Sequence, residues 1–179
     1  MNINWNVLTR KTHYWASLAI LLPALVIFGT GIVLQLKKDV AWIQPATQRG
    51  AQLPPQISFD EVLAAARSVK EAEIEDWSDV DRLDVRPNRG MLKIRSNNRW
   101  EIQIDTTSAD VLQVAYRRSD LIETIHDGSW FHDSVKLWLF FPTAIILFFM
   151  WLTGVYLFVV PYIARKRKRQ RLARKANAT

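Results

Sequence analysis

Residues 14–36 read YWASLAILLPALVIFGTGIVLQL, and residues 137–164 read LWLFFPTAIILFFMWLTGVYLFVVPYIA. Neither stretch contains an acidic or basic side chain. Each exceeds the roughly 20 apolar residues that an α-helix needs to cross the ~30 Å hydrocarbon core of a bilayer. About a hundred residues of mixed polarity separate the two stretches. The sequence therefore predicts a membrane protein with two spanning helices and a folded domain between them.

Positive charge is concentrated beside the two apolar stretches. The chain has a formal net charge of +7. Arg10 and Lys11 precede the first stretch, and eight basic residues with no acidic one among them lie between Arg165 and Lys175. In a soluble protein such basicity would suggest nucleic acid, but beside membrane helices it indicates topology and contact with anionic lipid. We expect both termini in the cytoplasm of a bacterial cell, and the central domain in the periplasm.

The segment between the spans has the pattern of a small α+β domain. Ser58-Phe59-Asp60-Glu61 is a capping box that starts a helix, and apolar residues follow it at helical spacing from Phe59 to Val69. Alternating apolar residues then predict strands near 83–85, 92–94, 100–104 and 111–116, with turns between them. Cysteine is absent, so we expect neither a disulfide nor a thiolate ligand.

The predicted fold class is thus membrane α plus α+β: two transmembrane helices flank a helix packed on an antiparallel meander. The expected segments are a cytoplasmic lead at 1–12, the first membrane helix at 13–36, a linker at 37–57, the periplasmic domain at 58–118, a membrane-returning segment at 119–133, the second membrane helix at 134–163, and a basic cytoplasmic tail at 164–179.

Seven acidic residues between Glu71 and Asp84 form the densest charge cluster outside the tail. Such a cluster is usually a solvated loop and strand edge, and the alternative is a site for a cation or a basic partner. Within the membrane helices, Thr30, Thr143 and Thr153 are the polar side chains at depth, and we expect them to bond to helix carbonyls.

Three motifs carry a resemblance to a known family. The stretch Arg10-Lys11-Thr12-His13-Tyr14-Trp15 resembles the RK-x-H-x-W start of PepSY-associated transmembrane proteins. Ile125-His126-Asp127 resembles their extracytoplasmic histidine segment, and Leu152-Thr153-Gly154-Val155-Tyr156 resembles the close of their last span. The resemblance extends to about Tyr162, and it implies that the central domain is a PepSY domain.

The resemblance also implies a setting. Larger PepSY transmembrane proteins, with four or more spans, resemble inner-membrane reductases of ferric-siderophore and iron handling, and some carry b-type haem. Short two-span members look like companions of flavin-transfer or iron-related redox proteins. This chain has only two predicted spans, which argues against a complete redox path within one copy. A family-wide role in inhibiting peptidases is a further possibility, without defined residues.

The three histidines, His13, His126 and His132, all lie at predicted membrane borders. One reading is that they are interfacial side chains bonded to Asp127 or Asp133. The other is that they bind haem b, because neutral imidazole is a suitable axial ligand. His13 and His126 lie across a ~30 Å core and cannot share a haem within one subunit, but a homodimer would bring each beside its own copy. Another metal at the His-Asp pairs is a weaker alternative.

Two function classes remain. The first is a non-enzymatic accessory subunit that docks to a membrane or periplasmic partner of an iron- or flavin-linked redox system. The second is an electron-transfer subunit that binds b-haem across a homodimer through His13, His126 and His132. The sequence contains no nucleophile elbow, P-loop, dinucleotide fingerprint or zinc-protease helix, so we lean toward a protein that is not itself an enzyme.

Overall fold

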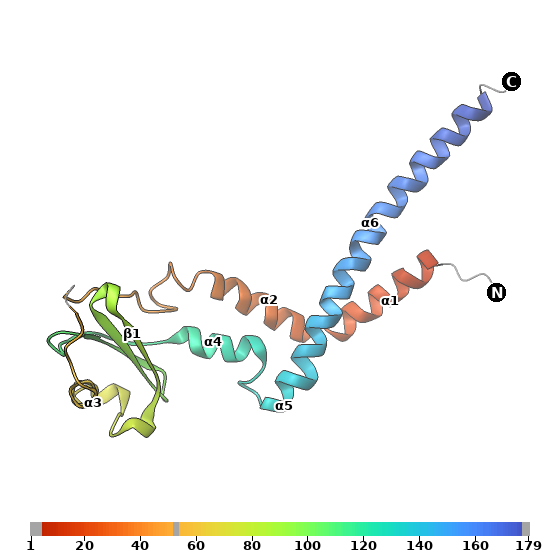
Figure 1. The fold of residues 1–179 in the computed structure, drawn as a ribbon. Helices are drawn as coiled ribbons and strands as arrows, with labels where there is room; N and C mark the ends of the chain where they lie inside the picture. Colours follow the sequence, from red (N-terminus) through yellow and green to blue (C-terminus); the bar gives the residue numbers. More distant parts are fainter. Residues whose placement is uncertain (1–4, 52–53, 177–179) are drawn as a thin grey trace. The chain divides into compact units, whose positions relative to one another are not determined.

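The computed structural model describes residues 5–51 and 54–176 (Figure 1). The chain divides into two compact units. One contains the residues up to 28 together with those from 127 onward, and the other contains residues 29–126. The first holds most of the apolar helices, and the second holds the sheet.

The first apolar stretch is divided into two helices. α1 runs from Trp5 to Ala19, α2 runs from Leu21 to Gln35, and the two are bent by 70° at their junction. Pro23 explains the break, because a proline has no N–H to donate to the carbonyl four residues earlier, here that of Ala19, and its ring crowds that carbonyl. The sequence predicts a single helix over 13–36 that Pro23 can bend. The structure instead ends one helix at Ala19, and it starts that helix within the segment expected as a lead.

The second apolar stretch forms one long helical segment. It comprises α5 (Asp133–Val135), the π-helical turn η4 (Lys136–Phe140) and α6 (Phe141–Ala176). The π turn stands just before Pro142, whose missing N–H leaves the regular ladder incomplete. The Thr143 hydroxyl donates to the Leu139 carbonyl at 2.7 Å, which confirms the role expected for this threonine.

Length and composition make residues 133–174 capable of crossing a membrane. The bent α1–α2 pair is a second such segment if its two halves act as one span. Helix α6 continues without interruption into the basic tail as far as Ala176. The described part of the chain therefore has one helical segment long and apolar enough to cross a membrane, and one bent pair of apolar helices.

The central domain is the expected antiparallel meander. Its strands are β1 (Val80–Arg86), β2 (Met91–Ser96), β3 (Trp100–Asp105) and β4 (Val111–Tyr116), in the spatial order β1-β2-β3-β4. Three short 3₁₀ turns join the elements: η1 (Lys70–Ala72), η2 (Trp77–Asp79) and η3 (Pro87–Arg89). Helix α4 (Arg118–Asp127) follows the last strand. We call residues 54–118 the sheet domain.

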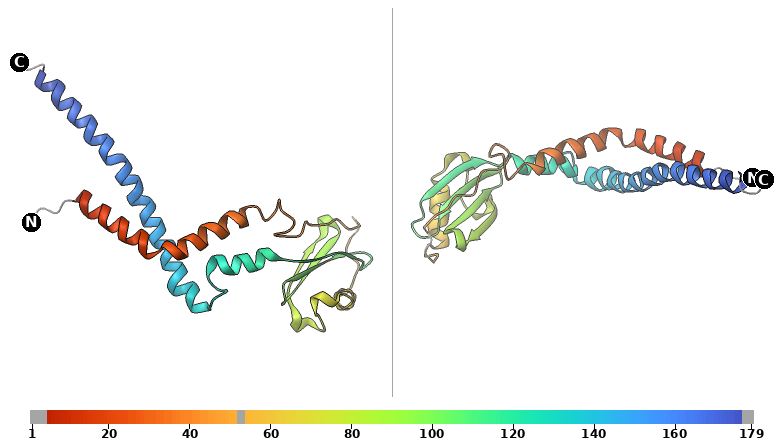
Figure 2. Two further views of the ribbon diagram at one scale, coloured as in Figure 1. Left: turned by 180° about the vertical axis from the view of Figure 1, so that it is seen from behind. Right: turned by 90° about the horizontal axis from the view of Figure 1, so that it is seen from above.

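Helix α3 (Phe59–Arg67) covers the apolar face of the sheet (Figure 2). The capping box is present: Glu61 N–H donates to the Ser58 hydroxyl, and Ser58 N–H donates to the Glu61 carboxylate at 2.7 Å. Buried side chains of α3, led by Val62 and Ala66, pack with Ile94, Ile102 and Ile104 of the sheet. Phe59 differs from the prediction. It opens the helix but is 68% exposed, so it lies outside this core.

The opposite face of the sheet is covered by the segment that the sequence predicts as a linker. Gln48 N–H donates to the Gln103 side-chain carbonyl at 2.7 Å, and the Gln103 amide donates to the Ala46 carbonyl at 2.9 Å. Farther along, Gly50 N–H donates to the Arg89 carbonyl. Residues 43–51, which we call the strap, therefore belong to the folded domain rather than to a free tether.

Asp105 anchors the far end of the strap. Its carboxylate accepts backbone N–H bonds from Ala51 at 2.6 Å, Thr107 at 2.7 Å and Ser108 at 3.1 Å. Burial alone would raise the pKa of Asp105, but these three donors outweigh it and the pKa lies below its ordinary value. The carboxylate therefore contributes stability above a pH of about 4, and this contribution is lost as the pH falls through the folded-state pKa.

Substituting Gly90 by alanine is expected to lift the strap from the sheet. Gly90 has a positive φ of 62°, and a Cβ there would stand 1.7 Å from the Ala51 carbonyl oxygen. Left-handed strain and backbone crowding together should reduce the free energy of unfolding by about 2–4 kcal/mol. Urea unfolding of the full chain in mild detergent, followed by hydrogen exchange at Gly50 and Ala51, measures this loss.

Gly29→Ala provides the matched control for Gly90→Ala. A Cβ at Gly29 meets no atom within 4 Å, and the residue is helical. Its substitution should leave strap exchange unchanged and stability equal or slightly higher. Equal exchange rates at Gly50 and Ala51 in Gly90→Ala and in the unaltered chain would contradict the role assigned to Gly90.

Candidate functional site

His13 lies on α1 against a threonine-glycine pair of α6. Its Nδ1 is 2.9 Å from the Thr153 hydroxyl, and that hydroxyl also bonds to the Met150 carbonyl at 3.0 Å. A carbonyl can only accept, so the threonine hydrogen is directed at Met150 and its oxygen accepts from Nδ1–H. This fixes the tautomer of His13 and leaves a lone pair on Nε2. The Met150 bond also confirms the carbonyl contact expected for Thr153.

The adjacent residue, Gly154, lies beside the His13 ring at ordinary van der Waals distance. A Cβ at Gly154 would lie 3.9 Å from Cε1 of His13. A second contact between the same two helices joins the Tyr156 hydroxyl, which donates to the Asn6 side-chain oxygen at 3.2 Å. His13 is therefore held where α1 meets α6, within one turn of α1 after Arg10 and Lys11.

His126 repeats the arrangement at the end of α4. Its Nδ1 is 2.8 Å from the hydroxyl of Thr30 on α2. A Cβ on the next residue, Gly31, would lie 3.4 Å from Cε1 of His126, closer than most such contacts. Each of the two apolar stretches thus presents a Thr-Gly pair, and each pair receives one histidine from a different helix.

His132 has a different environment. It is the N-cap of α5, and its Nδ1 accepts the backbone N–H of Ser134 at 3.0 Å. Since Nδ1 accepts, the neutral ring carries its proton on Nε2, which then has no lone pair to offer. The side chain is exposed. The structure therefore groups His13 with His126 by local geometry and sets His132 apart.

The aspartates that follow two of these histidines have other partners. Asp127 accepts from Ser129 N–H at 3.0 Å and from the Lys136 ammonium at 2.5 Å. Asp133 is the first residue of α5. Within residues 5–51 and 54–176, no group of three or more His, Cys, Asp or Glu is placed to hold a metal ion.

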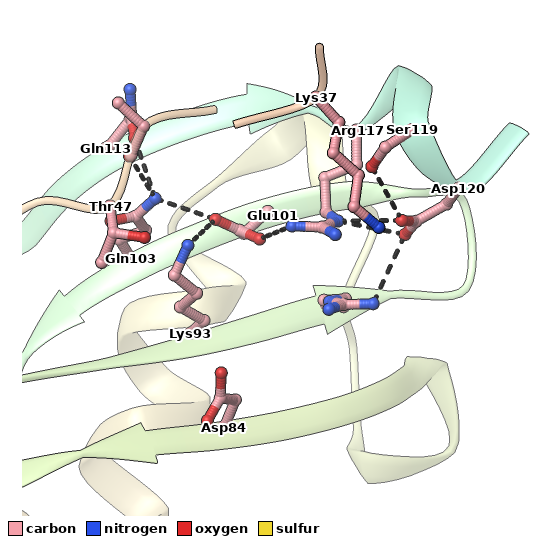
Figure 3. A network of polar contacts seen from close by, with 12 residues as sticks. Lys37, Thr47, Asp84, Lys93, Glu101, Gln103, Gln113, Arg117, Ser119 and Asp120 are labelled. Atoms are coloured by element: carbon pink, nitrogen blue, oxygen red, sulfur yellow. Dashed lines mark hydrogen bonds and ion pairs between the residues drawn. The ribbon is translucent and has the colours of Figure 1, made fainter. Parts of the chain in front are cut away.

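A second polar cluster lies in the sheet domain, on the face beneath the strap (Figure 3). Glu101 is fully buried and accepts from Lys93 at 2.8 Å, from Arg117 at 2.5 Å and from Gln103 at 2.8 Å. Arg117 also bonds through Nε to Asp120 at 3.1 Å. We call this set, together with Arg95 and Gln113, the buried network.

The buried network joins strands to the helix that leads away from the sheet. Lys93 is on β2 and Glu101 is on β3. Arg117 lies between β4 and α4, and Asp120 is in the first turn of α4. Burial lowers the pKa of Lys93, and the hydrogen bond and charge of Glu101 oppose this shift. Arg95, whose Nε has no partner within the described part of the chain, is 3.6 Å from Asp120 through Nη1.

The buried network is not evident from the sequence. Lys93, Arg95, Glu101 and Gln103 are the polar positions of alternating strands, and a single-layer meander normally exposes that face. One signal is present in the sequence: Lys93 and Arg95 alternate with apolar residues in one strand, and Glu101 and Gln103 do so in the next. The structure pairs Lys93 with Gln103 and Arg95 with Glu101, so opposite charges share a face. Only the path of the strap decides that this face is buried.

The acidic residues between Glu71 and Asp84 are partly used in local structure. Asp76 caps η2 by accepting from Ser78 N–H at 2.7 Å, and Asp79 accepts from Glu75 N–H at 2.8 Å. Asp84 forms an ion pair with Arg86 at 2.7 Å. These contacts match the reading of a solvated loop and strand edge.

Comparisons with known proteins give one result. The family model described as PepSY-associated TM region matches residues 10–177. That span begins with the motif around His13 and includes both Thr-Gly pairs and the whole sheet domain. No curated protein and no solved structure matches the chain.

Proposed function

Because the chain belongs to the PepSY-associated TM family, we propose that it is a non-enzymatic subunit of an iron- or flavin-linked redox system in the bacterial inner membrane. In this proposal both apolar stretches span the bilayer, the termini lie in the cytoplasm, and the sheet domain lies in the periplasm. The positive charges beside Arg10 and after Arg165 support this orientation.

The uncovered surface of α6 is the observation that carries the proposal. Only 6% of its most apolar window is buried by the rest of the chain. Bulky aromatic side chains stand outward along it, with Trp138 at 82% and Phe158 at 84% exposure. When the rest of the chain covers so little of an apolar helix, lipid and the helices of other chains cover its side chains in a membrane. This exposed apolar surface supports the proposal that α6 contacts the helices of a partner as well as lipid.

The sheet domain offers a matching contact in the periplasm. Phe59 and Trp77 form an edge-to-face pair with ring centroids 5.8 Å apart, and Trp77 is 39% exposed. Exposed aromatic side chains of this kind are enriched at protein interfaces. Asp76 and Asp79 flank the pair, so the surface suits a partner with apolar and basic side chains.

Photocrosslinking tests this proposal. A photoreactive amino acid at Trp77 in membranes of the native host should give an adduct that mass spectrometry identifies as a flavin- or iron-binding protein. The same probe at Val111, on the outer edge of the sheet in β4, serves as the control. An adduct at Trp77 with proteins unrelated to redox chemistry, or equal adducts at both positions, would refute the proposal.

A second candidate function rests on the histidine tautomer. In the proposed alternative, the chain is an electron-transfer subunit that binds haem b across a homodimer. Nδ1–H of His13 is engaged by Thr153, so Nε2 is the ring nitrogen that would bind the haem iron. A hydrogen bond from the remote ring nitrogen orients metal-bound histidines in the same way. His126 makes the same kind of Nδ1–hydroxyl contact with Thr30.

In this alternative, two copies would combine to hold the group. His13 of each copy would hold one haem near the cytoplasmic side, and His126 of each copy would hold a second near the periplasmic side. The bound group would supply one-electron transfer. The chain's own part is to orient the imidazoles through Thr153 and Thr30, and to exclude water with the aromatic side chains of α6. His132 does not fit, because its Nδ1 accepts from Ser134.

A further inference from the structure

A groove of about 540 Å³ lies between the start of α1 and the last turns of α6. Its size falls in the range of small-molecule sites, roughly 300–1,000 Å³. All of its lining residues belong to the same compact unit. Neither proposed redox role uses this groove.

The groove changes character along α6. Tyr156 closes its inner end, with its hydroxyl on Asn6. Val160 and Ile163 line its middle, and three cations line its outer end: Arg167, Lys168 and Arg171. α6 contains no acidic residue from Phe141 to Ala176, so no carboxylate of that helix neutralises these charges. The polarity therefore runs from apolar to strongly basic over a few helical turns.

We propose that this groove is a binding site for one anionic phospholipid. Its phosphate would lie among Arg167, Lys168 and Arg171, and the start of its acyl chains would lie on Val160 and Ile163. The order matches a lipid standing in the bilayer, because the basic end of the groove follows the apolar helix directly. Long basic side chains at helix ends reach toward headgroups while their stems stay on apolar surface. Each such cation also attracts the anionic headgroup.

Lipid binding in this groove differs from general attraction of the basic tail to the membrane. Charge alone would act through all of the basic residues between Arg165 and Lys175. A groove selects those on one side of the helix. At 100° per residue, Arg167, Lys168 and Arg171 share a face, whereas Arg165, Lys166 and Arg169 point to the other side. The inference depends on α6 lying in the membrane, as proposed above, and not on either redox role.

Native mass spectrometry of the full chain, released from detergent, provides the test. Phosphatidylglycerol and phosphatidylcholine are added in turn, and the bound lipid is counted. One variant carries Arg167→Gln, Lys168→Gln and Arg171→Gln. The matched control carries Arg165→Gln, Lys166→Gln and Arg169→Gln, with the same loss of charge from the opposite face. Circular dichroism reports whether each variant keeps its helices.

We expect one phosphatidylglycerol per chain, bound at least tenfold more tightly than phosphatidylcholine. The groove variant should lose at least tenfold in this affinity, and the control should stay within about twofold. Equal losses in the two variants would mean diffuse charge attraction and would overturn the site. Displacement by inorganic phosphate alone would show a simple anion site and would overturn it too. Alkaline extraction of membranes separately tests whether α6 is inserted. A failure of the membrane proposal can therefore be told apart from a failure of the lipid site.

Discussion

Glu101→Gln is expected to destabilise the sheet domain by about 3–5 kcal/mol, the cost of removing one partner from a buried ion pair. The carboxylate is fully buried between Lys93 and Arg117. Lys93 is only 2% exposed, so it cannot turn to water when its partner is neutralised. Domains of this size are stable by only about 5–15 kcal/mol. Urea unfolding of the full chain in mild detergent, with hydrogen exchange at β2 and β3 amides, measures the loss.

Glu123→Gln is the matched control for this prediction. Glu123 also pairs with a lysine, Lys37, at 2.8 Å, but its side chain is about half exposed. Exposed pairs contribute about 0–1 kcal/mol, so this variant should unfold close to the unaltered chain. Similar losses at Glu101 and Glu123 would show that burial does not decide the energetics of the network.

Restoring charge balance should recover much of the stability. In the double variant Lys93→Met with Glu101→Met, the buried cation and anion leave together, and the Arg117–Asp120 pair remains. Buried ion pairs replaced by apolar side chains of similar volume are often neutral or even stabilising. We therefore expect the double variant to lie well above Glu101→Gln in stability. Additive losses would mean that Lys93 and Glu101 act independently.

The contrast between the two faces of the sheet shows how far sequence reasoning reaches. The apolar face and the strands that carry it are predictable, because Leu92, Ile94, Ile102 and Ile104 alternate within short windows. The capping box at Ser58 and Glu61 is equally local. The buried network depends on a chain segment that returns across the sheet from some fifty residues away, as the bond from Gln48 to Gln103 does. No local period encodes that return.

The same distinction applies to the membrane helices. Two apolar stretches are evident from composition alone, and Pro23 indicates a bend. Composition does not indicate that α1 would begin at Trp5 or that the break would reach 70°. The three histidines are equivalent in sequence terms, each polar and each at a border. Their hydrogen-bond partners divide them into two classes: His13 and His126 contact the distant Thr153 and Thr30, whereas His132 accepts from the local backbone N–H of Ser134.

That division gives the haem proposal a sharp test. If the chain binds haem b, its reduced-minus-oxidised spectrum should show a b-type α-band. The full chain is purified for this measurement from cells supplied with haem precursor. His13→Ala and His126→Ala should each remove about half of the bound haem, since each histidine would serve one of two sites in the dimer. His132→Ala should retain the full band, because Nδ1 of that ring caps α5.

Substituting the threonine beside His13 distinguishes a histidine that binds haem from one with a structural role alone. Thr153→Val keeps the shape of the side chain but removes the oxygen that accepts from His13 Nδ1. Loss of such an orienting bond typically costs about 10–100-fold in metal affinity. The variant should therefore bind haem more weakly and shift the reduction potential of one site, with helix content unchanged. Thr143→Val is the control. Thr143 bonds the Leu139 carbonyl of its own helical segment, as Thr153 bonds the Met150 carbonyl, but this bond does not involve a histidine. A chain that purifies without an α-band, or that loses the band only in His132→Ala, would refute the haem proposal and leave the accessory subunit as the function to pursue.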